Sequence, residues 1–372
     1  MRIVYFTHSL ASCWNHGNAH FLRGVLRELI RRGHEVQVFE PDDAWSLRNL
    51  LADHGAAGLD AYREAYPDLT STAFGPQFDP AVALDGADLV IVHEWNDPVL
   101  VADIGRVRAA GGRFTLLFHD THHRAVSDPE AIRAFDLSSY DGVLAFGEAL
   151  AEVYRRWGWG ERVFVWHEAA DVALFHPPAE ECARQGLVWI GNWGDGERTA
   201  ELESFLLAPA QAAGLALDIY GVRYPDPVRW MLARHGARYR GWLPNARAPK
   251  VFARHLATVH VPRRFYVDAL PGIPTVRVFE ALACGIPLAS APWSDAEALF
   301  RPGQDYLVAR DGEEMKRHLR ALANDADLRA SLVRSGLESI IARHTCAHRA
   351  EDLLAVAGRL SQTCRPALET VW

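Results

Sequence analysis

The sequence contains no long hydrophobic run and no closely spaced pair of cysteines. No window approaches the roughly 18 apolar residues of a membrane-spanning helix. The apolar start at residues 3–6 is interrupted at once by Thr7 and His8, which does not fit a signal peptide. The 5 cysteines are an odd number without a CxxC pair, so neither a disulfide framework nor a zinc knuckle is indicated. We therefore expect a cytoplasmic protein in a reducing compartment.

Lysine is almost absent, because only Lys250 and Lys316 occur among 39 basic residues. With 47 acidic residues, the formal net charge is −8. This balance provides no field for wrapping nucleic acid or for binding an anionic membrane. We expect neither as a partner, and the composition leaves the oligomeric state open.

Common cofactor and catalytic motifs are also missing. No GxGxxG follows the first expected strand, and neither a GxxxxGKS or GxxxxGKT sequence nor a GxSxG elbow occurs. These absences argue against a dinucleotide held in the usual way and against a P-loop. Two HExxD strings, at residues 93–97 and 167–171, lack the second histidine of a zinc protease.

What is present is an alternation of short apolar runs and amphipathic segments. The 372 residues are about twice the length of one domain, and 49% of them are hydrophobic, as expected for full-sized cores. Strands interleaved with helices predict parallel sheets covered on both faces. Buried strands are expected at residues 2–6, 36–39, 89–92, 114–118 and 143–146, and again at residues 187–190, 217–220, 258–261 and 287–290.

The alternation is interrupted at residues 163–180, where we expect a linker. We predict an α/β protein of two doubly wound, Rossmann-like domains at residues 1–174 and 175–345, facing each other across a cleft. A C-terminal helix within residues 346–372 is expected to pack back on the first domain. Ligands of such sheets bind beyond the carboxyl ends of the strands, so the cleft is the expected site. Residues 66–80 are predicted to form a long loop that touches substrate.

The most concentrated polar cluster, FHDTHHR at residues 118–124, follows an expected strand. One hypothesis is contact with a polar substrate such as a sugar, including acid–base catalysis. A second is a metal site, and a third is a polar loop whose histidines are satisfied locally. We favour substrate contact, because histidines spaced so tightly on a loop rarely all face one ion. The residues concerned are His119, Asp120, His122 and His123.

Two segments of the second half place an arginine at the start of an expected helix. Arg198 follows the glycine-rich loop GNWGDGE, and Arg277 lies in the first turn after PGIPT. The helix dipole opposes a cation there, so an anion in the cleft is the more natural partner. Free N–H groups at a helix start also suit a phosphate. Two such arginines suggest a diphosphate, although Arg277 has an alternative partner in Glu280 at i+3.

Together these segments resemble the two-domain GT-B glycosyltransferases. Within them the match is closest to the CgeB-like, spore-protein-type group, which is similar to the retaining glycosyltransferase family four. The resemblance runs along nearly the whole chain. It is carried by Gly17-Asn18-Ala19-His20, residues 32–36, His119-Asp120, residues 171–177, Gly191-Asn192 with Arg198, Tyr220-Gly221, and residues 241–244, 274–280 and 344–350.

The resemblance implies transfer of a sugar from a nucleotide-diphosphate-sugar, expected to be UDP-linked, to an unidentified glycan, protein or small-molecule acceptor. It implies retention of configuration and no required metal or cofactor. Glu280 would hold the ribose hydroxyls, and the arginines would neutralise the departing diphosphate. The donor-binding residues implied are Gly191, Asn192, Arg198, Tyr220, Gly221, Arg263, Gly272, Ile273, Pro274, Thr275, Arg277 and Glu280, with Arg264 as a further candidate.

One position departs from family four. The glutamate expected eight positions before Glu280 is Gly272, so the catalytic role assigned to that glutamate has no carrier. Two alternatives stay open, a sugar-nucleotide epimerase on the same architecture and a binding protein without turnover. On the first domain the resemblance implies His119 and Asp120 as catalytic residues, and Gly17, Asn18, His20 and His122 on the sugar and acceptor side.

Overall fold

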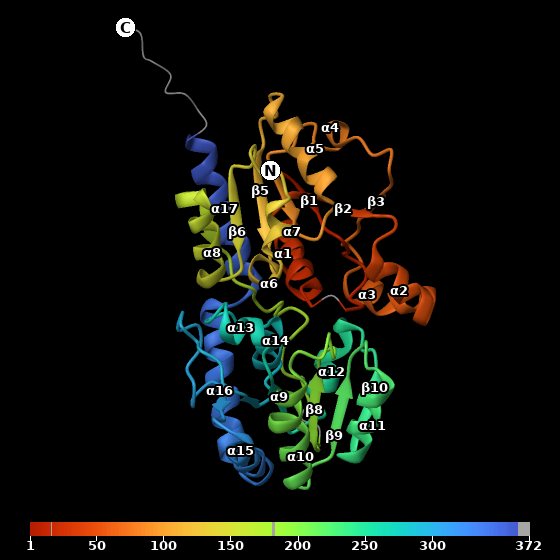
Figure 1. Cartoon of the computed structure of the whole chain (residues 1–372), viewed down its shortest axis with the longest axis vertical. Helices are drawn as coiled ribbons and strands as arrows, with labels where there is room; N and C mark the ends of the chain where they lie inside the picture. Colours follow the sequence, from red (N-terminus) through yellow and green to blue (C-terminus); the bar gives the residue numbers. More distant parts are fainter. Residues whose placement is uncertain (16, 181–182, 364–372) are drawn as a thin grey trace.

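The computed structural model describes residues 1–15, 17–180 and 183–363. Cys182, Cys364 and the part of the predicted C-terminal segment from residue 364 onward lie outside them. The described chain forms two α/β units, one above the other in Figure 1. Each is built on a parallel sheet, which confirms the predicted fold class.

The N-terminal sheet has 7 strands in the order β3-β2-β1-β4-β5-β6-β7, all parallel. Every residue of the central strands β4 and β5 is buried, as expected where helices cover both faces. The strand order reverses between β1 and β4, where such sheets bind ligands. The strands are β1 Arg2–Phe6, β2 Glu35–Pro41, β3 Thr72–Phe74, β4 Leu89–His93, β5 Thr115–Asp120, β6 Gly142–Ala145 and β7 Val163–Val165.

The first helix, α1 Ala19–Arg31, shows how the sequence determines local structure. Its stripe of apolar residues, which includes Phe21, Val25 and Leu29, faces the sheet and is buried. Gly33 ends it with a φ of 83°, a left-handed conformation that favours glycine. The other α-helices of this unit are α2 Trp45–His54, α3 Asp60–Ala65, α4 Pro80–Ala83, α5 Pro98–Ala109, α6 Arg124–Ser127, α7 Pro129–Arg133 and α8 Glu148–Tyr154.

The C-terminal sheet has 6 parallel strands in the order β10-β9-β8-β11-β12-β13. Its order reverses between β8 and β11, which again places the binding edge at the carboxyl ends. The strands are β8 Leu187–Ile190, β9 Leu217–Tyr220, β10 Ala237–Gly241, β11 Ala257–His260, β12 Leu288–Ser290 and β13 Leu307–Val308.

Helices close this unit on both sides (Figure 1). One helical segment of this unit contains a π-helical stretch, Glu203–Leu207, between α9 and α10. The α-helices are α9 Thr199–Leu202, α10 Ala208–Ala212, α11 Asp226–Arg234, α12 Ala248–Phe252, α13 Arg264–Asp268, α14 Val276–Ala283, α15 Gly312–Asn324, α16 Ala326–Arg343 and α17 Cys346–Thr363.

Two sequence-based expectations about loops were wrong. The predicted loop at residues 66–80 contains the strand β3, and the predicted linker at residues 163–180 begins with the strand β7. Both are edge strands of three residues and pair on one side only. The side chains of β3 are exposed or half-buried, and the apolar run of β7, Val163–Val165, is only three residues long, so neither strand stood out in the sequence.

The chain returns to the N-terminal unit at its end. Helix α17 packs against α1, and Leu353 and Ala357 share a core with Phe21. The indole of Trp166 donates to the carbonyl of Arg349 at 2.8 Å. In Figure 1, α17 runs along the N-terminal unit, where it shares this core with Leu117 of β5 and Leu144 of β6. The domain boundaries at residues 174 and 345 stay predictions.

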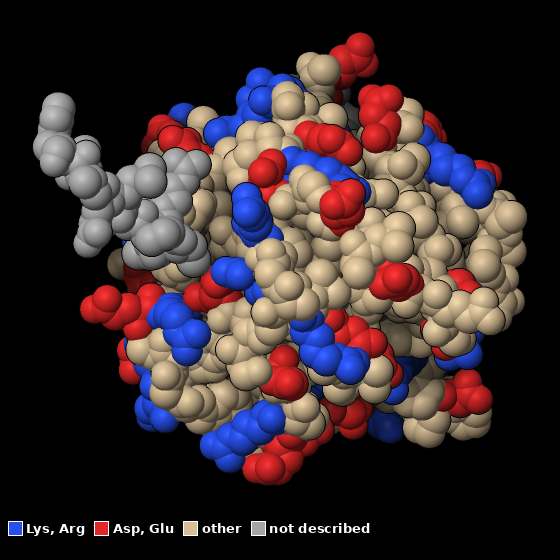
Figure 2. All heavy atoms as spheres, turned by 90° about the horizontal axis from the view of Figure 1, so that it is seen from above, with Lys and Arg blue, Asp and Glu red and all other residues tan. Residues whose placement is uncertain are grey.

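The described helices include none with the length and apolar character needed to cross a membrane. The end of the molecule drawn in Figure 2 carries basic and acidic side chains interspersed rather than gathered by sign.

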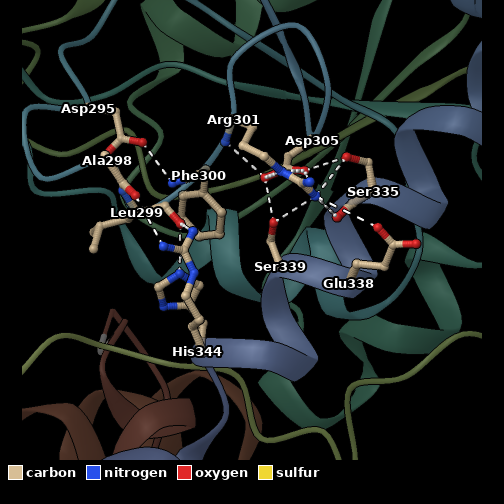
Figure 3. A network of polar contacts seen from close by, with 11 residues as sticks. Asp295, Ala298, Leu299, Phe300, Arg301, Asp305, Ser335, Glu338, Ser339 and His344 are labelled. Atoms are coloured by element: carbon tan, nitrogen blue, oxygen red, sulfur yellow. Dashed lines mark hydrogen bonds and ion pairs between the residues drawn. The ribbon is translucent and has the colours of Figure 1, made fainter.

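Helix α16 is held to the C-terminal sheet by a buried carboxylate (Figure 3). The Asp305 side chain is 0% exposed and accepts hydrogen bonds from the hydroxyls of Ser335 at 2.6 Å and Ser339 at 2.7 Å. It also accepts from the Arg301 guanidinium at 2.9 Å and from the Arg301 backbone N–H at 2.9 Å. A carboxylate is stable in the interior only when it is paired in this way.

We expect Asp305→Ala to lower the free energy of unfolding by about 3–5 kcal/mol, because it leaves Arg301 and both hydroxyls without their shared acceptor. Chemical denaturation measures this change. The matched control is Glu338→Ala, whose carboxylate lies 3.9 Å from Arg301 with its side chain 70% exposed. The control should cost less than about 0.5 kcal/mol, and equal losses for both variants would contradict the assignment.

Candidate active site

A cavity of about 600 Å³ lies where the carboxyl ends of the two sheets face each other. From the N-terminal unit it is lined by residues that follow β1, β4 and β5, such as His8, Trp95 and Thr121. From the C-terminal unit it is lined by residues that follow β8 and β9, such as Gly191 and Gly221. The predicted cleft between two strand edges is therefore present.

The structure brings eleven of the predicted site residues to this cavity and leaves others outside its lining. Those that line it are Gly17, Asn18, His122, His123, Gly191, Asn192, Arg198, Gly221, Arg263, Thr275 and Arg277. Those that do not line it are His20, His119, Asp120, Tyr220, Arg264, Gly272, Ile273, Pro274 and Glu280.

Two glycines shape the wall of the cavity beyond β8 and β9. A Cβ atom at Gly221 would overlap the carbonyl oxygen of Gly191, so the two loops approach each other as closely as backbones can. Asn192 holds the arrangement, since its Oδ1 accepts from the Val222 N–H at 2.9 Å. Its Nδ2 donates to Asn15 of the N-terminal unit at 2.5 Å, which joins the two walls.

Arg198 is a cation held by neutral groups. Its guanidinium donates to the carbonyls of Val261 at 2.7 Å and Asn192 at 3.0 Å, and it lies over the ring of Trp189 at 5.4 Å. Its Nε is buried without a hydrogen-bond partner among the described residues. Burial lowers the pKa of Arg198, although the group stays protonated at neutral pH. A positive charge oriented by carbonyls rather than by a carboxylate is suited to an anionic ligand.

Arg277 lies in the first turn of α14 and lines the cavity. Its alternative partner, the carboxylate at i+3, is also in contact with it. Arg277 forms an ion pair with Glu280, whose side chain is 0% exposed. Glu280 also accepts from Asn245 at 2.7 Å, and His20 of the other unit lies 3.5 Å away. Burial raises the pKa of Glu280, and Arg277 and Asn245 oppose the shift. The carboxylate therefore orients Arg277 and Asn245, which both line the cavity.

The hydrogen bonds of His20 define its tautomer. The backbone N–H of Asp171 donates to Nε2 of His20 at 2.9 Å, so Nε2 carries the lone pair. The proton of the neutral ring is then on Nδ1, which faces Glu280 at 3.5 Å. Burial and three nearby arginines lower the pKa of His20 well below its usual value. Predicted on the sugar side, His20 instead lies in the interface between the two units.

Arg263 and Arg264 are engaged with carboxylates. Arg263 lines the cavity but pairs with Glu197 at 2.6 Å and Asp195 at 3.2 Å. Arg264 pairs with Glu201 at 2.9 Å and lies outside the lining. A diphosphate would have to share Arg263 with these carboxylates.

Gly272 stands where family four usually has a glutamate, and its backbone conformation disfavours a side chain. Gly272 has a φ of 95°, and an added Cβ would lie 3.3 Å from the Cβ of Ala296. The next residue, Ile273, packs into the core of the N-terminal unit, in the same cluster as Phe146. The loop before α14 therefore makes an interdomain contact instead of presenting a carboxylate.

His119 and Asp120 lie behind the cavity, in the core at the end of β5. His119 is 2% exposed and its Nδ1 contacts the Tyr5 hydroxyl at 2.5 Å. Burial lowers the pKa of His119 to about 3. Asp120 is fully buried and accepts from Tyr154 at 2.7 Å, and burial raises its pKa to about 6. Their catalytic roles stay predictions.

The described residues contain no cluster of three or more histidines, cysteines or carboxylates that could hold a metal ion. The ring nitrogens of the histidine cluster point to separate partners. His119 contacts Tyr5, while His123 contacts Ser127 at 2.8 Å and stacks on Phe265 at 4.3 Å. The metal alternative has no support in this geometry.

Sequence reasoning missed the aromatic part of the lining. His8, Trp45 and Trp95 line the N-terminal half of the cavity, and Trp189 and Trp242 line the other half. A signal was present, because His8 and Trp95 follow the strands β1 and β4 just as His122 follows β5. Isolated aromatic residues usually belong to a core, so tryptophans scattered along the sequence did not stand out.

Two sequence families match the chain, one in each half. Residues 17–174 match the family described as Glycosyltransferase Family 4, and residues 198–355 match the family described as Glycosyl transferase-like. Each match alone covers less than half of the chain, and together they cover most of it. No curated protein matches the sequence.

Several solved structures share the fold. The HepE protein of Anabaena, in complex with UDP and glucose, has a TM-score of 0.68 at 14% identity, over 96% of this chain and 100% of that one. A sucrose-phosphate synthase from Thermosynechococcus elongatus has a TM-score of 0.66 at 13% identity, over 97% and 99% of the two chains. An alpha-glucosyltransferase bound to UDP and a 13-mer DNA has a TM-score of 0.68 at 13% identity, over 96% and 99%.

The close approach of the two glycine loops predicts the effect of a single methyl group. Gly221→Ala should lower the free energy of unfolding by about 3 kcal/mol, because the new Cβ meets backbone that cannot move aside. The control is Gly214→Ala, where φ is 71° and no atom lies within 4 Å of the added Cβ. In the control the free energy of unfolding should fall by only about 1–2 kcal/mol, because backbone strain is the sole cost. Chemical denaturation compares them, and equal losses would mean that the loops are not in contact.

Proposed function

We propose that the chain is a glycosyltransferase of the two-domain GT-B fold and that it transfers a sugar from a UDP-sugar to an acceptor hydroxyl, a proposal supported by the two family matches. The observation that carries the donor assignment is Arg198, a partly buried cation in the cavity wall with carbonyl partners. The first turn of α14, which lines the same cavity, adds N–H groups at the positive end of a helix dipole.

We place the donor on the C-terminal side of the cavity, within residues 175–345, and the acceptor on the side of residues 1–174. Arg198, Arg277 and the start of α14 would surround the diphosphate. Gly191 and Gly221 would let the backbone approach it closely, since neither has a side chain in the way. Glu280 would act by orienting Arg277 and Asn245, because its carboxylate is buried behind them.

The proposed sugar transfer needs no nucleophile from the protein. The acceptor oxygen forms a bond to the anomeric carbon, the bond from that carbon to the diphosphate oxygen breaks, and its electron pair leaves with UDP. The proton of the acceptor hydroxyl passes to the departing diphosphate oxygen. Arginine charges and helix-start N–H groups stabilise the negative charge as it develops.

Retention of configuration is part of the proposal. A double displacement needs a free carboxylate in the site, but the lining carboxylate among the described residues, Asp195, is paired with Arg263 at 3.2 Å. Substitution on one face of the sugar needs only the leaving group as base. Membership of the CgeB-like group and a cytoplasmic, reducing location stay part of the proposal, the latter supported by the free thiols of Cys13, Cys284 and Cys346. No feature of the described residues favours the epimerase or the inactive binding protein.

We expect the parent protein to bind UDP in calorimetric titration and Arg198→Ala to bind it about 10- to 100-fold more weakly. The lost charge-assisted hydrogen bond is worth roughly 1.5–3 kcal/mol. The affinity for uridine, which lacks the diphosphate, should fall less than the affinity for UDP in the same variant. The matched control, Arg264→Ala, removes a neighbouring arginine outside the cavity and should bind UDP like the parent. If the parent binds no nucleoside diphosphate, the donor site is wrong.

The predicted retention of configuration is tested on the product of the reaction. With a UDP-α-sugar donor, proton NMR of the first product formed should show an α-linkage. Asp195→Asn should give the same anomer, because Asp195 is not the nucleophile in this mechanism. A β-linked product would show inversion, and the proton would then have to pass to a base of the protein.

A further inference from the structure

The two halves of the cavity differ in charge. On the C-terminal side the lining carries Arg198, Arg223, Arg263 and Arg277, with Asp195 among them. On the N-terminal side the described lining residues include no lysine, arginine, aspartate or glutamate. A diphosphate suits the first half, so the second half is the part that an acceptor would meet.

The histidines on the N-terminal side add no charge at neutral pH. Burial lowers the pKa of His8 to about 4, with Arg124 adding to the shift. Burial also lowers the pKa of His122 to about 2 and that of His123 to about 4. This half of the cavity is therefore uncharged when the enzyme works near neutral pH.

Aromatic rings form the wall of this half. The rings of His8 and Trp45 are stacked with centroids 5.8 Å apart and an interplanar angle of 8°, and Trp95 lies 6.1 Å from His8. His122 meets Trp95 edge-on at 5.2 Å. Both indoles are only partly buried and line the cavity, so they present apolar surface to a ligand.

Neighbouring side chains hold Trp45 and Trp95 in place. Arg124 lies 4.0 Å from the centroid of the Trp95 ring and is itself ion-paired with the buried Glu94. Trp14 packs edge-on against Trp45 at 6.0 Å and donates its indole N–H to Asp53 at 2.9 Å. A wall fixed in this way binds a rigid ring with little loss of side-chain entropy.

Neutral polar groups lie beside the rings. Asn18 and Thr121 line the cavity and are hydrogen-bonded to each other, and the Thr121 hydroxyl also contacts His93 at 3.1 Å. An amide and a hydroxyl both donate and accept, as the hydroxyls of a sugar require. They offer no charge to a phosphate, a sulfate or a carboxylate.

We propose that this half of the cavity is an acceptor subsite for a neutral saccharide, whose C–H face packs on Trp45 and Trp95 and whose hydroxyls meet Asn18 and Thr121. The proposal rests on the proposed function, since it names the substrate that supplies the attacking hydroxyl. A nucleic-acid acceptor would bring phosphates to a wall without lysine or arginine, so it does not fit this half.

The test uses the full-length protein saturated with UDP. The complex is applied to an array of neutral glycans, acidic glycans and duplex DNA, and the best ligand is then titrated by calorimetry. We expect binding to neutral saccharides only. Trp95→Ala should weaken that binding at least tenfold and leave UDP affinity within twofold of the parent. The control is Trp230→Ala, a tryptophan of α11 that is 76% exposed and lies outside the cavity, and it should change neither affinity.

UDP affinity in the same titrations separates the two proposals. If the parent fails to bind UDP, the proposed function fails. The acceptor subsite is wrong if the parent binds UDP but, on the array, binds only DNA or acidic glycans. It is also wrong if Trp95→Ala binds the saccharide like the parent. Should Trp95→Ala also lose UDP, Trp95→Phe keeps a ring in place and is expected to bind UDP normally with intermediate saccharide affinity. Parent-like saccharide affinity in Trp95→Phe together with weak UDP binding would also overturn the proposal.

Discussion

The buried carboxylate of Glu280 is the constraint on which the site depends. A charge with 0% side-chain exposure is tolerated only with partners, and those partners come from two places in the fold. Arg277 comes from the same helix, and Asn245 comes from the loop after β10. The need to satisfy one carboxylate therefore orients two side chains of the cavity wall, and it does so next to the other unit, whose His20 lies 3.5 Å away.

Other contacts also join the two units. Asn192 donates to Asn15, and Glu297 accepts from the Glu148 backbone N–H at 2.9 Å while contacting His167 at 2.7 Å. Ile273 packs into the N-terminal core from the loop before α14. Loops of the C-terminal unit are therefore supported by the N-terminal unit, so the geometry on one side depends on the position of the other.

The division of charge across the cavity fits the proposed division of chemical tasks. Arginines and a helix start on one side would stabilise a departing anion, while neutral rings and amides on the other would neither repel nor trap it. Burial keeps the nearby histidines neutral, so the cations of the described lining stay on the proposed donor side. A net charge of −8 for the whole chain gives no hint of this arrangement, because recognition depends on local placement.

The sequence by itself determined the architecture, because buried parallel strands require continuous apolar runs and α1 requires its 3.6-residue stripe. It also indicated Gly191 and Arg198, since glycine loops and arginines at helix starts have local signatures, while Gly221 was implied by the family resemblance. Tertiary structure alone decided that Glu280 and His20 meet in the domain interface, that His119 is buried behind the cavity, and that Trp45 and Trp95 form its wall. Those relations join residues far apart in the sequence, and the packing of two sheets against each other sets them.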